Sequence, residues 1–403
     1  MPVNLKLIPP VAQKPKLPIG RRWLKGLTGL LVIGSGWAYF TGLSFHSSVF
    51  WIFSAGLPLT VWLVAIWLRI MVYLPVLIQA QAWDRRREEL LLREIRRGRR
   101  ALQILHSAFI TPHSEHQPTG SSSVNMLKQN KPLLHMQPSW HGIERFRHSR
   151  LPLEPGMKRD DLVKQIFDRL MAGIARHLNQ LPDHQPIALL FETNTSLSRQ
   201  RLHTLWCNAW QQRDIRQPVE PVTGYGLNVI DSWLDSRIHE ETVLLIIALH
   251  VAPDDPDGTG EAAVALLLGN RMTQNILPPL AWVHRPEASF ADTLAESIAQ
   301  ALDWVPVQPE DVHDLWSSGL SHQQQSTIAA LNAHPPLQGI EMNSRLYNLD
   351  RTLGETGCVA PWLAIAAAAQ GTKESQLIMS GETGSTKMWS VVVSPCQTAK
   401  EKV

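Results

Sequence analysis

Two apolar stretches near the N-terminus decide the layout of this chain: Leu27–Phe45 reads LTGLLVIGSGWAYFTGLSF, and Val49–Leu68 reads VFWIFSAGLPLTVWLVAIWL. Neither contains a charged residue, and each has roughly the 20 residues that an α-helix needs to cross the hydrocarbon of a bilayer. A buried helix of a soluble protein would have a polar face, which both stretches lack. A signal peptide would have a shorter apolar run and a cleavage site. We therefore predict a two-helix transmembrane hairpin within residues 23–83.

The charges around the hairpin predict its orientation. Basic residues lie before it and after it, whereas His46–Ser48, between the two stretches, contain no Lys or Arg. Positively charged flanks stay in the cytoplasm. We expect two spans in a bacterial inner membrane, with both termini cytoplasmic and the lipid bilayer as one partner. The flanking basic residues are Lys6, Lys14, Lys16, Arg21, Arg22 and Lys25 before the hairpin, and Arg85, Arg86, Arg87, Arg93, Arg96, Arg97, Arg99 and Arg100 after it.

The segments on either side of the hairpin have distinct compositions. Residues 1–22 are basic and rich in proline, which predicts a disordered N-terminus. Residues 84–106 have apolar side chains at helical spacing (Leu91, Ile95, Leu102, Leu105), which predicts a basic juxtamembrane helix, either lying on the inner leaflet or continuing the second span as a stalk. Residues 107–155 are rich in His, Pro, Ser and Gln and are predicted to be a flexible linker. Within them, residues 138–155 could instead form an arm on the following domain.

Charge and cysteine usage exclude several classes of function. Residues 1–105 hold 15 Lys and Arg against 4 Asp and Glu, and the rest of the chain holds 23 against 31. An acidic soluble part argues against nucleic-acid binding, which needs a cationic surface. The three cysteines, Cys207, Cys358 and Cys396, are widely spaced and are expected to be free thiols. No Cys/His spacing typical of a metal site occurs, so we expect neither a metal nor a cofactor.

Residues 156–403 alternate between helical periodicity and short apolar runs. Continuous apolar strands between helices indicate an α/β domain with a mixed sheet covered on both faces. Residues 262–268 fit a strand or a short helix equally well. The predicted helices are 160–181, 198–212, 227–237, 294–302 and 360–370, and the predicted strands are 186–192, 242–250 and 388–393.

Three segments of this domain, taken in order, resemble the β-ketoacyl synthase (thiolase-like) superfamily. An acidic DG turn leads into a Gly-Glu-Ala segment and an apolar run over Asp257–Leu268. A Gly-containing segment, Asp350–Gly357 (DRTLGETG), then opens an Ala-rich helix, and a Gly-rich turn feeds a strand over Gly381–Val393. The resemblance covers about Thr223 to Val393. It implies a layered α-β-α-β-α fold that is often dimeric.

The resemblance also implies a catalytic Cys and two His residues, which this chain lacks or replaces. The nucleophile position falls near Gly224–Asn228 (GYGLN), where there is no Cys. The second His position matches Arg351, and the first lies near Val312–Gly319, where His313 is close. Gly224, His313 and Arg351 are therefore candidates for a vestigial pocket. Because the covalent route needs the missing nucleophile, condensation chemistry is not expected.

Other residues could carry different chemistry. Cys207 fits a packed thiol on a helix and Cys358 a structural one. A hydrolase would use Ser317 or Ser318 with His313 and Asp314, but no G-x-S-x-G motif is present. Glu261 and Glu355 lie in Gly-rich turns, where turn and capping roles are commoner than acid catalysis.

The sequence predicts a membrane-anchored, non-catalytic ketosynthase-like interaction module. Its layout is similar to that of accessory membrane components of bacterial type VI secretion systems, so partners in a secretion complex and a homodimer are expected. The alternative is an active membrane-tethered acyltransferase or hydrolase whose nucleophile has moved.

Overall fold

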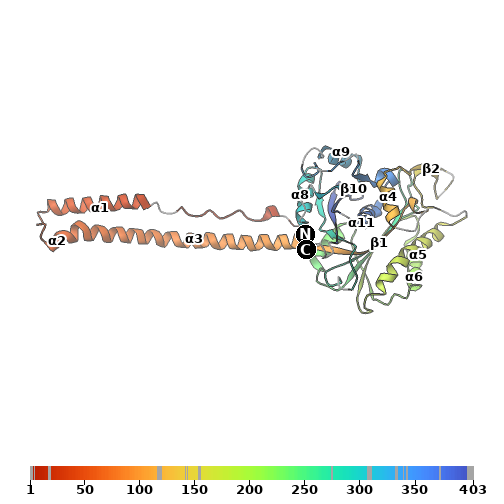
Figure 1. Ribbon diagram of the computed structural model, residues 1–403, viewed down its shortest axis with the longest axis horizontal. Helices are drawn as coiled ribbons and strands as arrows, with labels where there is room; N and C mark the ends of the chain where they lie inside the picture. Colours follow the sequence, from red (N-terminus) through yellow and green to blue (C-terminus); the bar gives the residue numbers. More distant parts are fainter. Residues whose placement is uncertain are drawn as a thin grey trace, which may run out of the picture. The chain divides into compact units, whose positions relative to one another are not determined.

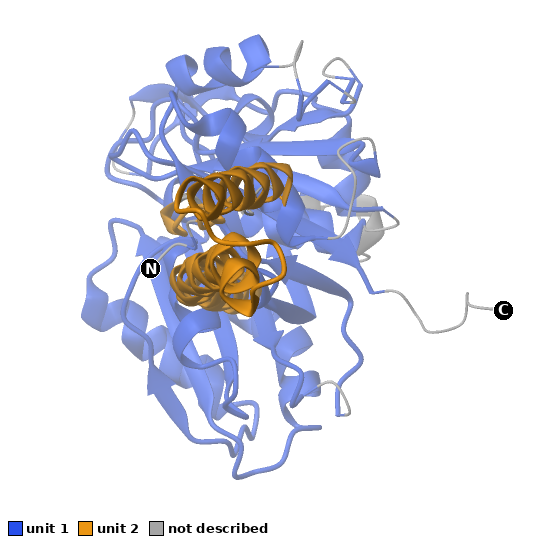
Figure 2. Cartoon of the chain, turned by 90° about the vertical axis from the view of Figure 1, so that its left-hand side faces the viewer, with its two compact units in different colours: residues 1–3, 95–403 blue, residues 4–94 orange. Residues whose placement is uncertain are grey.

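The structure is a computed structural model of the chain. It describes residues 3, 5–16, 20–115, 120–140, 142, 144–152, 156–273, 276–305, 311–331, 335–338, 340–341, 344–371 and 374–396. Residues 4–94 form one compact unit, and residues 1–3 and 95–403 form the other (Figure 2).

The smaller unit is a helical hairpin followed by a long helical extension (Figure 1). Helix α1 (Gly20–Phe40) lies against the helix that follows, because the Trp62 indole donates to the Trp23 carbonyl at 2.8 Å. Gly34 permits this close approach, since a Cβ there would lie 2.6 Å from Pro58 Cγ. The second helix comprises α2 (Ser48–Trp51), a π-helical turn (Ile52–Gly56) and α3 (Leu57–Gly98).

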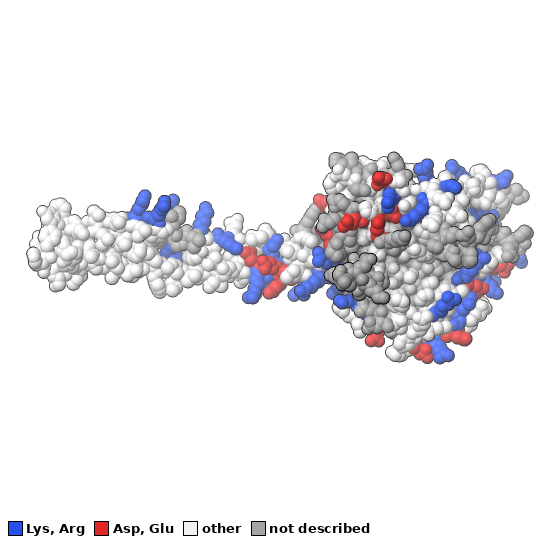
Figure 3. All heavy atoms as spheres, viewed as in Figure 1, with Lys and Arg blue, Asp and Glu red and all other residues white. Residues whose placement is uncertain are grey.

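One helix among the described residues is long and apolar enough to cross a membrane. It runs from Ser48 to Gly98, and its most apolar window has a mean hydropathy of 2.2 and is wholly unburied. Charged side chains are absent around the hairpin turn and begin further along both helices (Figure 3). Helix α1 is not among the helices that meet the same criterion of length and apolar character. The structure thus supports one apolar span, and the second remains a prediction.

The proline-rich N-terminal segment was predicted to be disordered, but its described residues form hydrogen bonds with α3. Residues 8–16 run extended beside α3, where the Ala12 N–H donates to Asp84 Oδ1 at 2.9 Å. Arg87 Nε donates to the Pro9 carbonyl at 2.8 Å. Proline has no backbone N–H to donate, but its carbonyl can still accept such a bond. A short 3-10 turn, Leu5–Leu7, precedes this segment.

The larger unit is built from two copies of one element order, β-α-β-α-β-α-β-β. The first copy is β1 (Ala101–Ile110), α5 (Arg159–Leu178), β4 (Ile187–Asn194), α6 (Arg199–Gln211), β5 (Val219–Pro221), α7 (Asn228–Ser236), β6 (Val243–His250) and β7 (Ala262–Gly269). The second is β8 (Ala281–His284), α8 (Leu294–Trp304), β10 (Asp314–Ser318), α9 (His322–Leu331), β11 (Leu346–Asn348), α11 (Ala360–Gln370), β12 (Gln376–Gly381) and β13 (Met388–Pro395). The shared order indicates an internally duplicated domain.

The strands of both copies also pair in the same order. The path is β11-β10-β12-β13-β8-β1-β7-β6-β4-β5, with β9 (Glu287–Ser289) beside β13. In each copy two parallel pairings are followed by two antiparallel ones. The copies join where β1 and β8 run antiparallel, with Leu102 opposite Val283. The predicted α/β class and mixed sheet are confirmed.

The core separates into layers because successive strand residues face opposite sides of a sheet. Leu244, Ile246 and Ala248 of β6 face a central cluster that contains α7, α11 and residues of both copies. The intervening residues of β6 face a second cluster with α5 and α6. A third cluster, with α8 and α9, covers the outer face of the second copy. Ala360–Ala369 of α11 are all buried, as a helix between two sheet surfaces must be.

The prediction for residues 99–155 is wrong in part. The juxtamembrane helix ends at Gly98, and residues 101–110, assigned to that helix and to the linker, form the central strand β1. Leu102 and Leu105 continue the helical spacing of the preceding segment, but they face the central and second clusters from opposite sides of β1. The intended linker also contains a 3-10 turn (Pro112–Glu115), α4 (Gly120–Lys128), β2 (His135–Pro138) and β3 (Arg145–His148).

The alternative of a packed arm is confirmed for the described residues of 138–155. The Glu261 carboxylate accepts hydrogen bonds from the Trp140 indole at 2.5 Å, the Leu151 N–H at 2.9 Å and the Ala252 N–H at 3.0 Å. Burial raises the pKa of Glu261, which these bonds partly offset. Glu261 therefore fixes the arm to the end of β6, as a turn residue with a structural role. The other elements predicted in residues 156–403 are confirmed, and residues 262–269 are a strand.

Candidate functional site

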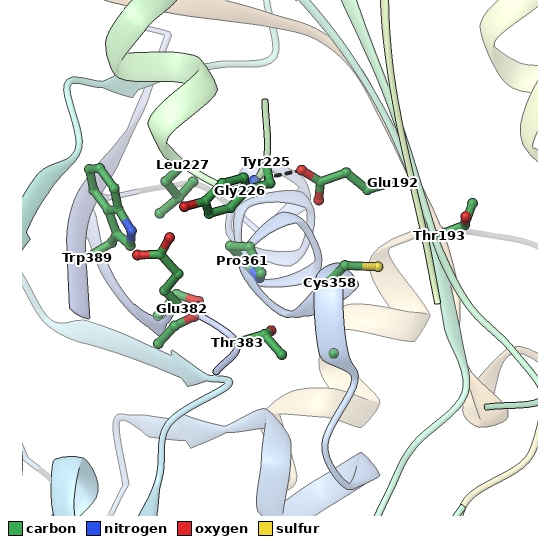
Figure 4. Close-up of a pocket in the computed structure, with 13 residues that line it drawn as sticks. Glu192, Thr193, Tyr225, Gly226, Leu227, Cys358, Pro361, Glu382, Thr383 and Trp389 are labelled. Carbon is green, nitrogen blue, oxygen red and sulfur yellow. Dashed lines mark hydrogen bonds between the residues drawn. The ribbon is translucent and has the colours of Figure 1, made fainter. Parts of the chain in front are cut away.

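A pocket of about 250 Å³ opens where the two copies meet (Figure 4). The first copy contributes the end of β4 and the turn before α7, and the second contributes the start of α11 and the turn between β12 and β13. Both buried central helices therefore point their N-termini toward one cavity. The lining residues are Glu192, Thr193, Tyr225, Gly226, Leu227, Gly357, Cys358, Pro361, Ser380, Gly381, Glu382, Thr383 and Trp389.

Glu192 joins the two copies across this pocket. Its Oε1 accepts from the Gly226 N–H at 2.6 Å, and its Oε2 accepts from the Trp362 indole at 2.8 Å. The side chain is 9% exposed, and burial raises its pKa against the lowering effect of both hydrogen bonds. Gly226 has φ +53°, a left-handed conformation that glycine adopts without steric cost. The N–H before α7 that could hold a ligand's oxyanion is thus already bound by a carboxylate of the chain itself.

The opposite wall of the pocket is acidic and aromatic. Tyr225 is 63% exposed, and the nearby Glu382 carboxylate raises the pKa of its hydroxyl. Lys387 lies with its Nζ 3.7 Å from Glu382 and 4.1 Å from the ring centroid of Trp389. Glu382 is therefore paired with Lys387, a cation from the β12–β13 turn.

Cys358 supplies the thiol that lines this pocket. Its Sγ contacts the Leu249 carbonyl at 3.6 Å, and burial raises the pKa of the thiol to about 12, assisted by the nearby Glu192 carboxylate. Nucleophilic thiols have lowered pKa values and lie in electropositive surroundings. Cys358 has the opposite environment, which suits a structural thiol.

His250 is buried directly beside this part of the pocket. It is 2% exposed, and a Cβ on Gly357 would lie 2.8 Å from its Nδ1, so only glycine fits there. Gly357 also has φ +52°, which favours glycine independently. Burial lowers the pKa of His250 to about 4, so the imidazole is neutral near pH 7.

The three candidates from the sequence do not meet in this pocket. Gly224 lines a neighbouring pocket of about 260 Å³, and its sequence neighbours Tyr225, Gly226 and Leu227 line the main one. Arg351 is exposed on α10 (Leu349–Leu353), where its N–H is bonded by the Asn348 side chain at 2.9 Å. His313 precedes β10 and lies 3.9 Å from Glu374. Tyr225, Gly226 and Leu227 of the segment Gly224–Asn228 thus line the main pocket, whereas His313 and Arg351 are not among its lining residues.

The hydrolase candidates also have structural positions. Asp314 accepts from Lys128 at 2.8 Å and from Arg345 at 3.2 Å, so its carboxylate is engaged away from His313. Ser318 is buried and lies 3.4 Å from Ser380 Oγ. Glu355 is exposed and acts through its backbone, which pairs with Thr259. Among the described residues, no group of three or more His, Cys, Asp or Glu is placed to hold a metal ion.

A second, larger pocket of about 790 Å³ lies between α6 and the strands β4 and β5. It contains Cys207, whose Sγ lies 3.6 Å from Nδ1 of His203 one turn earlier on α6. Cys207 is partly exposed in this pocket, although the sequence favoured a packed core thiol. The i,i+4 spacing of His203 and Cys207 was the signal that could have paired them.

Comparison with known proteins gives a likeness of fold. The chain is similar to the ishigamide ketosynthase/chain length factor (12% identity, 73% of this chain and 99% of that one, TM-score 0.49) and to an oxazolomycin ketosynthase domain from Streptomyces albus (11%, 74% and 96%, 0.48). A 3-oxoacyl-[acyl-carrier-protein] synthase III from Aquifex aeolicus is also similar (13%, 73% and 99%, 0.43). No protein-family model and no curated protein sequence matches. At these identities and TM-scores the similarity extends only to the course of the backbone.

Proposed function

We propose that this chain is a membrane-anchored, non-catalytic binding module with a ketosynthase-like domain. The observation that supports it best is the position of Glu192, whose carboxylate occupies the Gly226 N–H at the start of α7. The turn before that helix holds no Cys, and the thiol in the same pocket, Cys358, has a pKa raised to about 12. An acyl group at this turn would therefore meet no Cys nucleophile, and the Gly226 N–H would already be bound.

The proposed partners are proteins of a bacterial secretion membrane complex of the type VI kind. The apolar helix Ser48–Gly98 and its basic flanks support an anchor with a domain in the cytoplasm. On this proposal the chain crosses the inner membrane twice and associates with a second copy through its soluble domain. Cross-linking in intact cells, followed by identification of the attached proteins, tests it: capture of secretion-complex components that survives Arg351→Ala is expected. Capture of none of them would contradict the assignment.

The topology is tested separately by cysteine accessibility. A Ser47→Cys variant places a thiol in the turn between the two helices. We expect a membrane-impermeant maleimide to label this variant in intact cells with a permeabilised outer membrane, while the unmodified chain is labelled only after lysis. Labelling of the unmodified chain in intact cells would refute a cytoplasmic domain.

An active enzyme is the competing candidate, and one observation favours it. Cys207 and His203 lie 3.6 Å apart in the larger pocket, the spacing of a thiol and a base that could share a proton. Incubation with a small acyl thioester and measurement of the intact mass separates the two candidates. The binding module predicts no adduct, whereas an acyl group on Cys207 that is lost in Cys207→Ser would establish the enzyme.

A further inference from the structure

We infer that the pocket between α6 and the β4–β5 edge binds a small amphipathic carboxylate, with its apolar body against a wall of aromatic side chains and its anionic group at Arg199. This site is independent of the proposed function, because it uses neither Glu192 nor the cavity between the two copies. Thr193, at the end of β4, is the lining residue that the two pockets share.

The size and lining of the pocket fit a small ligand. Its volume of about 790 Å³ falls within the roughly 300–1,000 Å³ common for small-molecule sites. Three aromatic rings form a continuous wall: Phe191 and Trp206 have centroids 5.5 Å apart, and Trp206 and Trp210 have centroids 5.6 Å apart. Leu189, Leu202 and Val222 add apolar surface. Such walls match a flat or branched apolar body.

The charge of the pocket selects an anion. Arg199 lines it, and none of the lining residues that the structure describes is Asp or Glu. Within the described part of the chain Arg199 forms no ion pair with a carboxylate, whereas Arg201 on the same helix pairs with Asp160 at 2.6 Å. Arginine binds carboxylates through a planar fork of N–H donors. A ligand carboxylate at this end of the pocket would form an ion pair with the Arg199 guanidinium.

The position of Arg199 on the helix adds to the attraction. Helix α6 begins at Arg199 after the N-cap Ser198, whose side chain accepts from the Arg201 N–H at 3.3 Å. The partial positive charge of a helix N-terminus favours an anion near the first turn. Leu202, Trp206 and Trp210 follow along the helix at intervals of four residues, which places the apolar wall directly beyond this cationic end.

Protection of Cys207 from alkylation tests the site, because the thiol lines the pocket. The full chain in detergent is treated with iodoacetamide, with and without naphthalene-2-carboxylate, and each cysteine is followed by peptide mass spectrometry. We expect saturable slowing at Cys207 of at least about fivefold with no change at Cys396. The neutral naphthalene-2-carboxamide should need at least about tenfold more ligand for the same protection, since it lacks the charge that Arg199 would bind.

Two variants localise the effect. Arg199→Gln should raise the half-protecting concentration of the carboxylate about tenfold and leave that of the carboxamide unchanged. Arg216→Gln is the matched control, because Arg216 is exposed, pairs with Asp183 at 3.6 Å and does not line the pocket. Absence of protection by the carboxylate would overturn the inference. Equal protection by both ligands, or an unchanged response in Arg199→Gln, would overturn the anion assignment.

Discussion

The position of β1 in the centre of the sheet has a direct consequence for stability. Ile104 is fully buried, lies in the central cluster and is paired with strands on both sides, opposite Leu268 of β7 and Ala281 of β8. Replacing it with Ala removes three carbon atoms from a site that cannot collapse, since both neighbouring strands hold its backbone. Buried Ile→Ala changes cost about 2–5 kcal/mol. We expect a loss of about 3–4 kcal/mol for Ile104→Ala.

Thermal unfolding of the full chain in detergent, followed by tryptophan fluorescence, measures this loss. In a domain of this size each kcal/mol lowers Tm by roughly 2 °C, so Ile104→Ala should unfold at least about 6 °C earlier. Met136→Ala is the control, because Met136 is 60% exposed on β2, where a change should stay within about 0.5 kcal/mol. Equal Tm values for the two variants would refute the placement of residues 101–110 in the core.

Two substitutions and one reactivity measurement test the buried charges and the thiol. Arg285 is fully buried and pairs with Asp231 at 2.5 Å and with Asp235 at 2.6 Å. Arg285→Met removes both pairs and should lower the free energy of unfolding by about 3 kcal/mol or more, measured by thermal unfolding. A decrease below about 1 kcal/mol would contradict this. Burial raises the pKa of Glu287 to about 7, so the folded state binds its proton more tightly and the native protein gains stability as pH falls from about 7 toward the unfolded value of about 4.5. Glu287→Gln lacks this gain: its stability relative to the native protein should fall by up to ~3 kcal/mol between pH 8 and pH 4.5, and denaturant titrations showing no such change would exclude it. Cys358 should react with iodoacetamide at pH 8 at least ~100-fold more slowly than an ordinary thiol, and a normal rate would show that its pKa is not raised.

Local patterns determined much of this protein from the sequence. Helical periodicity over residues 160–181 and 198–212, and the apolar runs at 186–192 and 242–250, each reflect one element whose residues are neighbours along the chain. The apolar character of residues 49–68 is likewise a property of composition and length, and it gave the long membrane-compatible helix. The candidate segment Gly224–Asn228 came from the resemblance to the β-ketoacyl synthases, and three of its residues line the pocket between the two copies.

Only the tertiary structure decided the role of β1 and the composition of the pocket. A strand buried on both faces has no alternation, so residues 101–105 resemble a helix until β7 and β8, more than 150 residues later, are seen to pair with β1. Glu192 is one residue of an apolar run, and its partners Gly226 and Trp362 lie 34 and 170 positions away. Contacts between such distant segments depend on how the two copies join. Patterns within a short stretch of sequence do not show how they join.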